Sequence, residues 1–459
     1  MSSNSPRSVQ TYFNELVSWA TSTLTGDEVL TASLSAEDSD FVRFNRGEVR
    51  QAGSVRQRMV TLDLIDGAGS GDGSAAGTAH AEASVQLAQD PTLDRARITA
   101  MITQLREQRA LAPPDPYLAY ATDVVSTDVV ADGGGVPEPE WALDTIQRAA
   151  ADHDLVGIYA AGDVYHGFAN SLGQRNWFQS STFNFDWSLY LQADKAVKTL
   201  YAGHQWDQAA FESKVRWATD QLAVLARPPV ALDPGHYRTY LAPTAVTELI
   251  DMMSWGGFGL EAHRTKQTPL LRMVTEGATL DPAIRISEDI AHGVAPNFQE
   301  QGYLRPDEVV LIDHGAYNDW LVSPRSSKEY GVPTNGASAG EWPMALAMGG
   351  GTLGAGDVLS TLDTGLYVGN LWYLNFSDRA ACRTTGMTRF ATFWVENGEI
   401  VAPANVMRFD DTAFHLLGSN LVGLSSEVET MLDPSTYGGR SSASHRLPGA
   451  LVDDMTFTL

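Results

Sequence analysis

Residues 157–193, GIYAAGDVYHGFANSLGQRNWFQSSTFNFDWSLYLQA, decide the fold of this chain. Aromatic side chains recur in alternating runs on both sides of Asn170-Ser171-Leu172-Gly173. Alternation of this kind is typical of β-strands, and a short polar segment with a glycine is typical of the turn between two strands. The stretch therefore predicts an antiparallel strand pair.

The residues before this pair predict helices and a further antiparallel meander. Apolar side chains at helical spacing predict an amphipathic helix over 9–24, a second over 92–110 and a third over 139–153. Between the first two helices, short alternating segments lie at 29–38, 41–53 and 56–66, with a turn at Asn45-Arg46-Gly47. A Gly/Ser/Ala tract at 67–77 predicts a flexible loop.

The pattern of helix and strand segments is interrupted at Arg227-Pro228-Pro229, which predicts a domain boundary. One helix is expected from about Thr244 to Gly256, followed by short strands, glycine-rich loops and a hairpin turn at Asn397-Gly398. We expect an α+β protein with two domains. Residues 1–227 form an N-terminal helix and antiparallel-sheet domain, and residues 228–459 form a predominantly β domain. A doubly wound parallel sheet is disfavoured because long apolar strands are missing.

The composition excludes several classes of partner. Lys and Arg total 31 against 56 Asp and Glu, which gives a net charge of -25, so the surface repels nucleic acid and anionic membranes. The sequence shows no export signal and no apolar run long enough for a membrane helix. The single cysteine, Cys382, can form neither an internal disulfide nor a multi-thiolate zinc site. These features predict a soluble, cytoplasmic protein.

No familiar catalytic motif stands out in the sequence. The glycines at 349–356 lack the Lys-Ser or Lys-Thr of a phosphate-binding loop. A G-x-S-x-G elbow and an H-E-x-x-H pair are both missing, and the histidines are scattered singly. The nearest approach to a metal-ligand cluster is Glu261-Ala262-His263, whose two donors would point to different faces of a helix.

Several stretches nevertheless resemble the TldD/PmbA (TldE) family, and they occur in the family's order along nearly the whole chain. Residues 41–67 are similar to its N-terminal meander, and residues 168–193 are similar to its Asn-Ser-x-Gly strand pair. Four further segments are similar to its C-terminal half: YLAPTAVTELIDMM (240–253), 302–336, DTGLYV (363–368) and TTGMTRFATFWVENGEI (384–400).

The resemblance also shows what this chain lacks. TldD-type members carry His-Glu-x-x-x-His after the equivalent of YLAPTAV, followed by Gly-Leu-Glu. Aligning that triplet with residues 259–261 places Met253 and Phe258 at the two histidines and Ser254 at the general base. No shift restores the motif, because residues 251–267 hold one histidine, and residues 438–459 hold no cysteine to supply the family's C-terminal thiolate. We expect no catalytic residue and no metal or other cofactor in this chain.

This pattern is similar to the PmbA/TldE type, which pairs with a TldD-type catalytic subunit. The resemblance implies a heterodimer in which zinc belongs to the partner chain. It also implies a chamber between the subunits where unfolded peptides, including precursors of peptide natural products, are cut. Whether the chain forms a homodimer when alone stays open.

Two aromatic, glycine-rich stretches, 367–376 and 384–394, are candidates for a peptide-facing surface. Their aromatic residues can equally fill a β core. The family's Gly-Asp-Tyr/Phe-Ser turn is here Gly386-Met387-Thr388-Arg389, so the correspondence is incomplete. The candidate substrate-binding residues are Tyr367, Trp372, Tyr373, Arg389 and Trp394.

Two other functions compete with this interpretation. The first is a homodimeric peptidase with an unfamiliar site built from Glu261, His263 or His314, which stoichiometric metal would favour. The second is a non-enzymatic peptide-binding protein that works without a catalytic partner.

Overall fold

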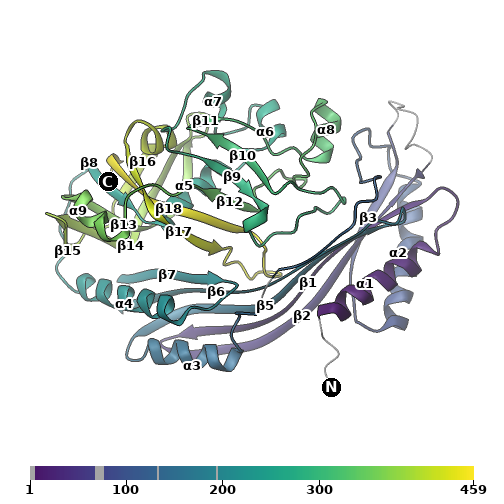
Figure 1. Cartoon of the computed structure of the whole chain (residues 1–459), viewed down its shortest axis with the longest axis horizontal. Helices are drawn as coiled ribbons and strands as arrows, with labels where there is room; N and C mark the ends of the chain where they lie inside the picture. Colours follow the sequence, from purple (N-terminus) through teal and green to yellow (C-terminus); the bar gives the residue numbers. More distant parts are fainter. Residues whose placement is uncertain (1–5, 68–76, 132–133, 193–194) are drawn as a thin grey trace.

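Figure 1 shows the computed structural model of the chain, which describes residues 6–67, 77–131, 134–192 and 195–459. The N-terminal half is built on a seven-stranded sheet in the order β3-β2-β1-β5-β6-β4, with β7 also paired to β6. All of its pairings are antiparallel except the one between β4 and β6. Its strands are β1 (Val29–Asn45), β2 (Glu48–Ile65), β3 (His80–Gln86), β4 (Thr127–Val130), β5 (Asp154–Asn170), β6 (Arg175–Gln192) and β7 (Lys195–Gly203).

One face of this sheet is apolar and is covered by the four N-terminal helices. These are α1 (Pro6–Thr21), α2 (Pro91–Arg109), α3 (Pro139–Ala149) and α4 (Gln208–Leu225). Alternate residues of β1 point to them, Leu30 and Leu34 toward α1 and α2, and Phe44 toward α3 and α4. Asp90 begins α2 by accepting hydrogen bonds from the backbone N–H groups of Thr92 and Leu93. Figure 1 shows these helices along one face of the sheet. The alternating strands bury one set of side chains beneath them.

The C-terminal half contains an eleven-stranded mixed sheet, in the order β11-β10-β9-β12-β18-β16-β14-β13-β8 with β15 on β14 and β17 on β18. Its strands are β8 (Gly235–Leu241), β9 (Ile286–Asp289), β10 (Glu308–Asp313), β11 (Ala316–Tyr317), β12 (Ala345–Met348), β13 (Gly365–Asp378), β14 (Arg383–Glu396), β15 (Glu399–Pro403), β16 (Arg408–Thr412), β17 (Leu421–Leu432) and β18 (Ser444–Phe457).

The helices of this half are short. They are α5 (Pro243–Ser254), α6 (Leu260–Arg264), α7 (Leu271–Thr275), α8 (Pro324–Tyr330) and α9 (Val358–Leu362), together with single turns at Ile290–His292, Ala355–Asp357 and His415–Ser419. The helix α5 is deeply embedded, with Ala245, Val246 and Ile250 in the main core of this half. No helix among the described residues is long and apolar enough to cross a membrane.

The second face of the N-terminal sheet meets the C-terminal half through polar contacts and through an apolar cluster in which Phe168 and Phe178 pack with Phe298. Gln174 Nε2 donates to Gly302 O at 2.7 Å, and Asn184 Nδ2 donates to Leu432 O at 3.3 Å. Arg440 donates to the backbone oxygens of Gly162 and Thr182, at 3.1 and 2.9 Å. Such buried hydrogen bonds depend on geometry, so they favour one orientation of the two halves.

The predicted α+β, two-part architecture with a β-rich C-terminal half is confirmed. The strand pair at 157–193 forms β5 and β6. The prediction of short segments in the meander was wrong in length, because β1 and β2 run unbroken for 17 and 18 residues. The sequence analysis also missed α4. The boundary at 228 stays a prediction, and residues 68–76 of the Gly/Ser/Ala tract lie outside the described residues.

His166 gives the contact between the halves a pH dependence. Its Nε2 lies 3.2 Å from Ser442 Oγ, and burial, with the positive charge of Arg305 second, lowers its pKa to about 4. A histidine in an unfolded chain has a pKa of about 6.5. As the pH falls below this value, the unfolded chain binds a proton at this histidine that the folded chain does not bind. This group therefore reduces the free energy of unfolding progressively between those two pKa values, and has no effect at higher pH.

We predict that His166→Gln removes this component. Between pH 7 and 5 the wild-type chain should lose about 2 kcal/mol more unfolding free energy than the variant. Urea unfolding at several pH values measures this, with His204→Gln, a change at an exposed histidine, as the control. Equal pH slopes for wild type and His166→Gln would contradict the assignment.

Candidate functional site

The positions that the resemblance assigns to a metal site lie at the end of α5, inside the apolar core. Met253 and Phe258 are 1% and 0% exposed and pack in the main core of the C-terminal half. Ser254 is also buried, and its Oγ has no hydrogen-bond partner in the described part of the chain. The helix ends here because Gly256 has φ 72°, and a Cβ on Gly257 would lie 1.8 Å from Met253 O.

These side chains do not fit a zinc ion. A thioether is a poor zinc ligand, phenylalanine has no donor atom, and a serine hydroxyl cannot act as the general base for a metal-bound water at neutral pH. No group of three or more His, Cys, Asp or Glu side chains that could hold a metal ion occurs among the described residues.

The residues of the alternative peptidase site are held apart by different partners. His263 is buried, and its Nε2 lies 2.7 Å from Gly257 O and 2.9 Å from Tyr317 Oη. Burial lowers the pKa of His263, which keeps the imidazole neutral. Glu261 is exposed on α6, and His314 is exposed with its Nδ1 3.1 Å from Asp313. None of the contacts made by the described residues joins Glu261, His263 and His314 to one another.

Cys382 is buried at the tip of the hairpin formed by β13 and β14. Burial raises the pKa of its thiol to about 12, which leaves almost no thiolate at neutral pH. This cysteine is therefore part of the core packing and is a poor nucleophile.

The same hairpin carries all five candidate substrate-binding residues, but the structure divides them. Tyr367 packs between Tyr240 and Phe393, with ring centroids 5.4 and 6.5 Å away, and burial raises the pKa of its hydroxyl. Trp394 packs edge-on against Tyr237, and its Nε1 donates to Glu396 Oε1 at 2.8 Å. Tyr367 and Trp394 thus lie against the core and do not form part of an open surface.

Trp372, Tyr373 and Arg389 do come together on the surface. The Arg389 guanidinium lies 4.4 Å from the centre of the Trp372 ring, and the rings of Trp372 and Tyr373 are 5.4 Å apart. Trp372 is 41% exposed and Tyr373 is 78% exposed. A β-bulge between Trp372 and Asn375, where Tyr373 has φ 57°, interrupts the pairing of the two strands at this point.

A second aromatic group adjoins the tip of the hairpin, and the sequence analysis missed it in part. Arg379 Nε donates to Gln267 O at 2.7 Å, and its guanidinium lies 4.8 Å from the Phe376 ring and 5.4 Å from the Trp255 ring. Trp255 is 49% exposed and directly follows α5. The described residues show no contact between this group and the first. We call the two groups together, Trp372, Tyr373 and Arg389 with Trp255, Phe376 and Arg379, the aromatic patch.

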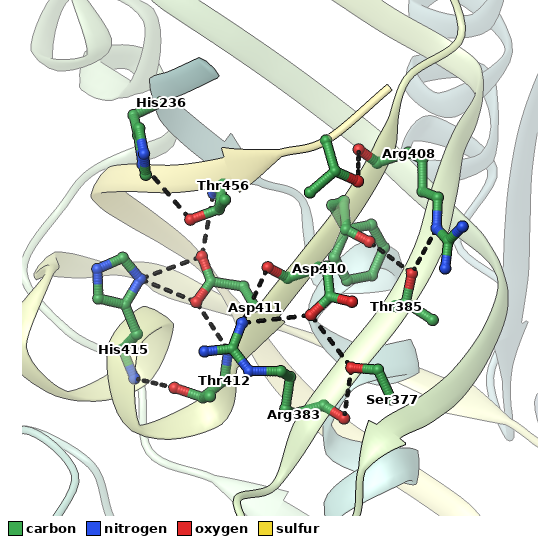
Figure 2. Close-up of polar contacts among 12 residues, drawn as sticks. His236, Ser377, Arg383, Thr385, Arg408, Asp410, Asp411, Thr412, His415 and Thr456 are labelled. Atoms are coloured by element: carbon green, nitrogen blue, oxygen red, sulfur yellow. Dashed lines mark hydrogen bonds and ion pairs between the residues drawn. The ribbon is translucent and has the colours of Figure 1, made fainter. Parts of the chain in front are cut away.

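Figure 2 shows the polar network that holds this hairpin against its neighbours. Asp410 accepts hydrogen bonds from Ser377 Oγ at 3.1 Å and Arg383 Nη1 at 3.2 Å, which joins both strands of the hairpin to β16. Asp411 is 2% exposed and accepts from the backbone N–H groups of Thr412 and Thr456 at 2.7 and 3.0 Å.

His415 Nδ1 lies 3.0 Å from Asp411 Oδ2, so three groups surround this carboxylate. A carboxylate satisfied in this way links β16, β18 and the turn at 415–419. The network therefore holds in place the hairpin that carries these aromatic residues.

Comparisons with known proteins agree with the resemblance found in the sequence. The PmbA/TldA metallopeptidase C-terminal domain family matches residues 234–459. A search of curated proteins gave no significant match.

TldE from Thermococcus kodakarensis has a solved structure that is 15% identical to this chain, with a TM-score of 0.74. A proposed modulator of a DNA gyrase from Thermotoga maritima is 14% identical, with a TM-score of 0.72. Each match covers 98% of this chain and 100% of the solved structure's own chain. A proposed DNA gyrase modulator from Bacteroides thetaiotaomicron is 14% identical, covers 97% of this chain and 98% of its own, and has a TM-score of 0.69. At these identities the structures establish a shared fold.

Proposed function

The chain belongs to the TldD/PmbA family, and we propose that it is the metal-free, TldE-type partner of a TldD-type metallopeptidase chain. One observation carries this proposal: Met253, Ser254 and Phe258 occupy the positions that the resemblance assigns to the metal site. Met253 and Phe258 are 1% and 0% exposed. Restoring zinc ligands would require polar imidazoles in a packed apolar core, which is strongly unfavourable. Zinc and the general base then come from the partner chain.

The contribution of this chain is to shape the peptide chamber and to bind peptide. One feature that supports this is the outer edge of β2. The neighbouring strand β3 pairs only with Met59–Ile65, and Leu87 N donates to Arg58 O, so from Glu48 to Gln57 the outer edge of β2 has no paired strand among the described residues. An extended peptide can add to such an edge through main-chain hydrogen bonds, which are tolerant of sequence.

The aromatic patch is the second feature that supports peptide binding. When a peptide binds, exposed tryptophan and tyrosine rings can bury a large area against it and lose little side-chain entropy. The two arginines are held over ring faces. Trp255 also directly follows the helix that would carry the metal ligands in a TldD-type chain. We place the peptide on this patch and leave Tyr367 and Trp394 with a packing role.

Mixing the purified chain with a TldD-type chain that carries an intact His-Glu-x-x-x-His motif tests the pairing. We expect a heterodimer by size-exclusion chromatography with light scattering, and cleavage of unfolded peptide that is lost when the partner's glutamate is changed to glutamine. Ser254→Ala in the present chain should leave the rate unchanged, because its hydroxyl takes no part in the reaction. Peptide cleavage by this chain alone would favour the homodimeric peptidase, and peptide binding without pairing would favour the non-enzymatic peptide-binding protein.

Replacing Trp372 and Tyr373 by alanine tests whether the aromatic patch binds peptide. We expect the affinity for a fluorescein-labelled unstructured peptide to fall about tenfold, because stacking area is lost while pairing with the partner chain persists. Fluorescence anisotropy measures the affinity. Tyr437→Ala, a change at a tyrosine that is 99% exposed outside the patch, is the control and should bind normally. Unchanged affinity in the Trp372→Ala/Tyr373→Ala variant would remove the patch from the proposal.

A further inference from the structure

Two adjoining cavities, of about 260 and 570 Å³, lie on the second face of the N-terminal sheet beside the free edge of β2. The larger volume lies in the range of small-ligand sites. Both cavities are lined by Glu37 of β1, Gln57 of β2 and the glycine pair Gly438-Gly439 of the C-terminal half. We call the two cavities together the groove. It shares no residue with the aromatic patch.

The strand register places Glu37 on the floor of the groove. Glu37 lies opposite Gln57 in the pairing of β1 with β2. Its chain neighbour Ala36 packs in the core with α1 and α2, so the alternation of strand side chains directs Glu37 to the second face. Phe41 and Gly53 are another opposed pair, and a Cβ on Gly53 would meet no atom within 4 Å. The missing side chain at Gly53 leaves open space between the larger cavity and the outer edge of β2.

Glu37 is buried with one carboxylate oxygen unsatisfied. The residue is 3% exposed, and its Oε1 accepts a hydrogen bond from Gln57 Nε2 at 2.6 Å. Its Oε2 is buried and has no hydrogen-bond partner in the described part of the chain. Buried polar atoms normally have a partner, because leaving one unpaired costs free energy. The Oε2 atom therefore requires a donor that the described residues do not supply.

The cations around Glu37 are bound to other groups. Arg440, which lines the smaller cavity, directs its Nη donors to Ser39 and Thr182 and to backbone oxygens of β5 and β6. Arg58 points to the opposite face, where it forms an ion pair with Asp38. Among the described residues no cation forms an ion pair with the carboxylate of Glu37. A buried negative charge thus faces the groove without a bound counter-ion.

The free edge of β2 identifies the molecule that would carry the missing donor. An extended peptide added along Glu48–Gln57 would lie two strand spacings, or roughly 10 Å, from β1. Peptide side chains opposite Val55 and Gln57 share the second face with them and point over the groove. A long side chain of lysine or arginine covers the distance together with the side chain of Glu37. Its aliphatic part would pass Val55 and Phe41, which line the larger cavity.

We propose that Glu37 binds a basic side chain, lysine or arginine, of a peptide that adds as a strand to the outer edge of β2. The peptide and its place on β2 rest on the proposed function. An ammonium or guanidinium group combines hydrogen-bond donors with a positive charge, so it satisfies Oε2 and neutralises the carboxylate. It would stand closer to this carboxylate than Arg440 does, and the net charge of -25 favours a cation. The chain would thus select unfolded peptides that carry a basic residue.

Binding of defined peptides to the full chain tests the proposal without a catalytic partner. The probes are blocked, unstructured peptides of equal length that differ at one central residue, which is lysine, arginine, glutamine or norleucine. We expect at least one of the two basic peptides to bind about tenfold more tightly than the norleucine peptide by calorimetry. Equal binding of all four would overturn the proposal. Binding of the glutamine peptide as tight as that of the basic peptides would show that a neutral donor suffices, and would overturn the cationic class.

The source of the cation is tested with Nα-acetyl-lysine amide, which carries the ammonium without a peptide strand. It should not displace the basic peptide, because it cannot add to β2. Full displacement at equal concentration would overturn strand addition.

The variant Glu37→Gln retains the size of the side chain and removes its charge, so the preference for a basic residue should disappear. Glu107→Gln, which removes a charge from an exposed position of α2, is the control and should retain the preference. A preference that persists in Glu37→Gln, or that is lost equally in the control, would overturn the assignment to Glu37.

The variant Ala52→Pro tests the edge and leaves Glu37 in place. Arg58 O accepts from Leu87 N on the outer side of β2, and strand backbone groups alternate, so the N–H of Ala52 also points outward. Proline removes this donor, and binding of all four peptides should weaken. Unchanged binding would overturn strand addition.

The proposed function and the role of Glu37 fail separately. If pairing with a TldD-type chain fails while the preference for basic peptides persists, the proposed function is wrong and Glu37 retains its role. If pairing is intact and the wild-type chain shows no preference, the role of Glu37 alone is overturned.

Discussion

The rest of the structure depends on the alternation of apolar and polar side chains along the long strands β1, β2, β5 and β6. Their alternating apolar side chains bury one face of the sheet under α1–α4, and this burial is the main stabilising contribution of the N-terminal half. The opposite face is left to meet the C-terminal half, where Asn184 Nδ2 donates a hydrogen bond to Asp433 O and Arg440 Nη2 donates one to Thr182 O. A slip of one residue in register would exchange the two faces, so the same alternation determines the core and the contact between the halves.

In the C-terminal half the central helix α5 packs into the apolar core, and the proposed function rests on this packing. In α5 and the turn after it, Met253 and Phe258 fill the core, while the end of the helix presents Trp255 to solvent beside Phe376 and Arg379. The exposed groups on this side of the molecule are thus aromatic rings and guanidinium groups, which suit binding better than bond cleavage. The network around Asp410 and Asp411 keeps the hairpin that bears them in place.

Local patterns in the sequence were sufficient for the strand pair at 157–193, for α1, α2, α3 and α5, and for the family. The helix α4 was not predicted although Asp207 is a recognisable N-cap, because exposed alanines such as Ala209, Ala210 and Ala223 reduce the contrast between its apolar and polar faces. Sequence alone could not separate Trp372 and Tyr373 from Tyr367 and Trp394, since all four occur in similar aromatic strands and only the bulge after Trp372 and the packing of β8 distinguish them. Residues 31, 82, 300 and 325 line one cavity although they are far apart in the sequence, and local sequence patterns do not reveal contacts at such a separation.

The zinc content of the purified protein is the most direct test of the claim that this chain contributes no metal chemistry of its own. After dialysis against a modest concentration of zinc, elemental mass spectrometry should find less than about a tenth of an equivalent on the chain alone. The complex with an intact TldD-type chain should retain roughly one equivalent. About one equivalent bound to the isolated chain would contradict the account and direct attention to His263 and Glu261.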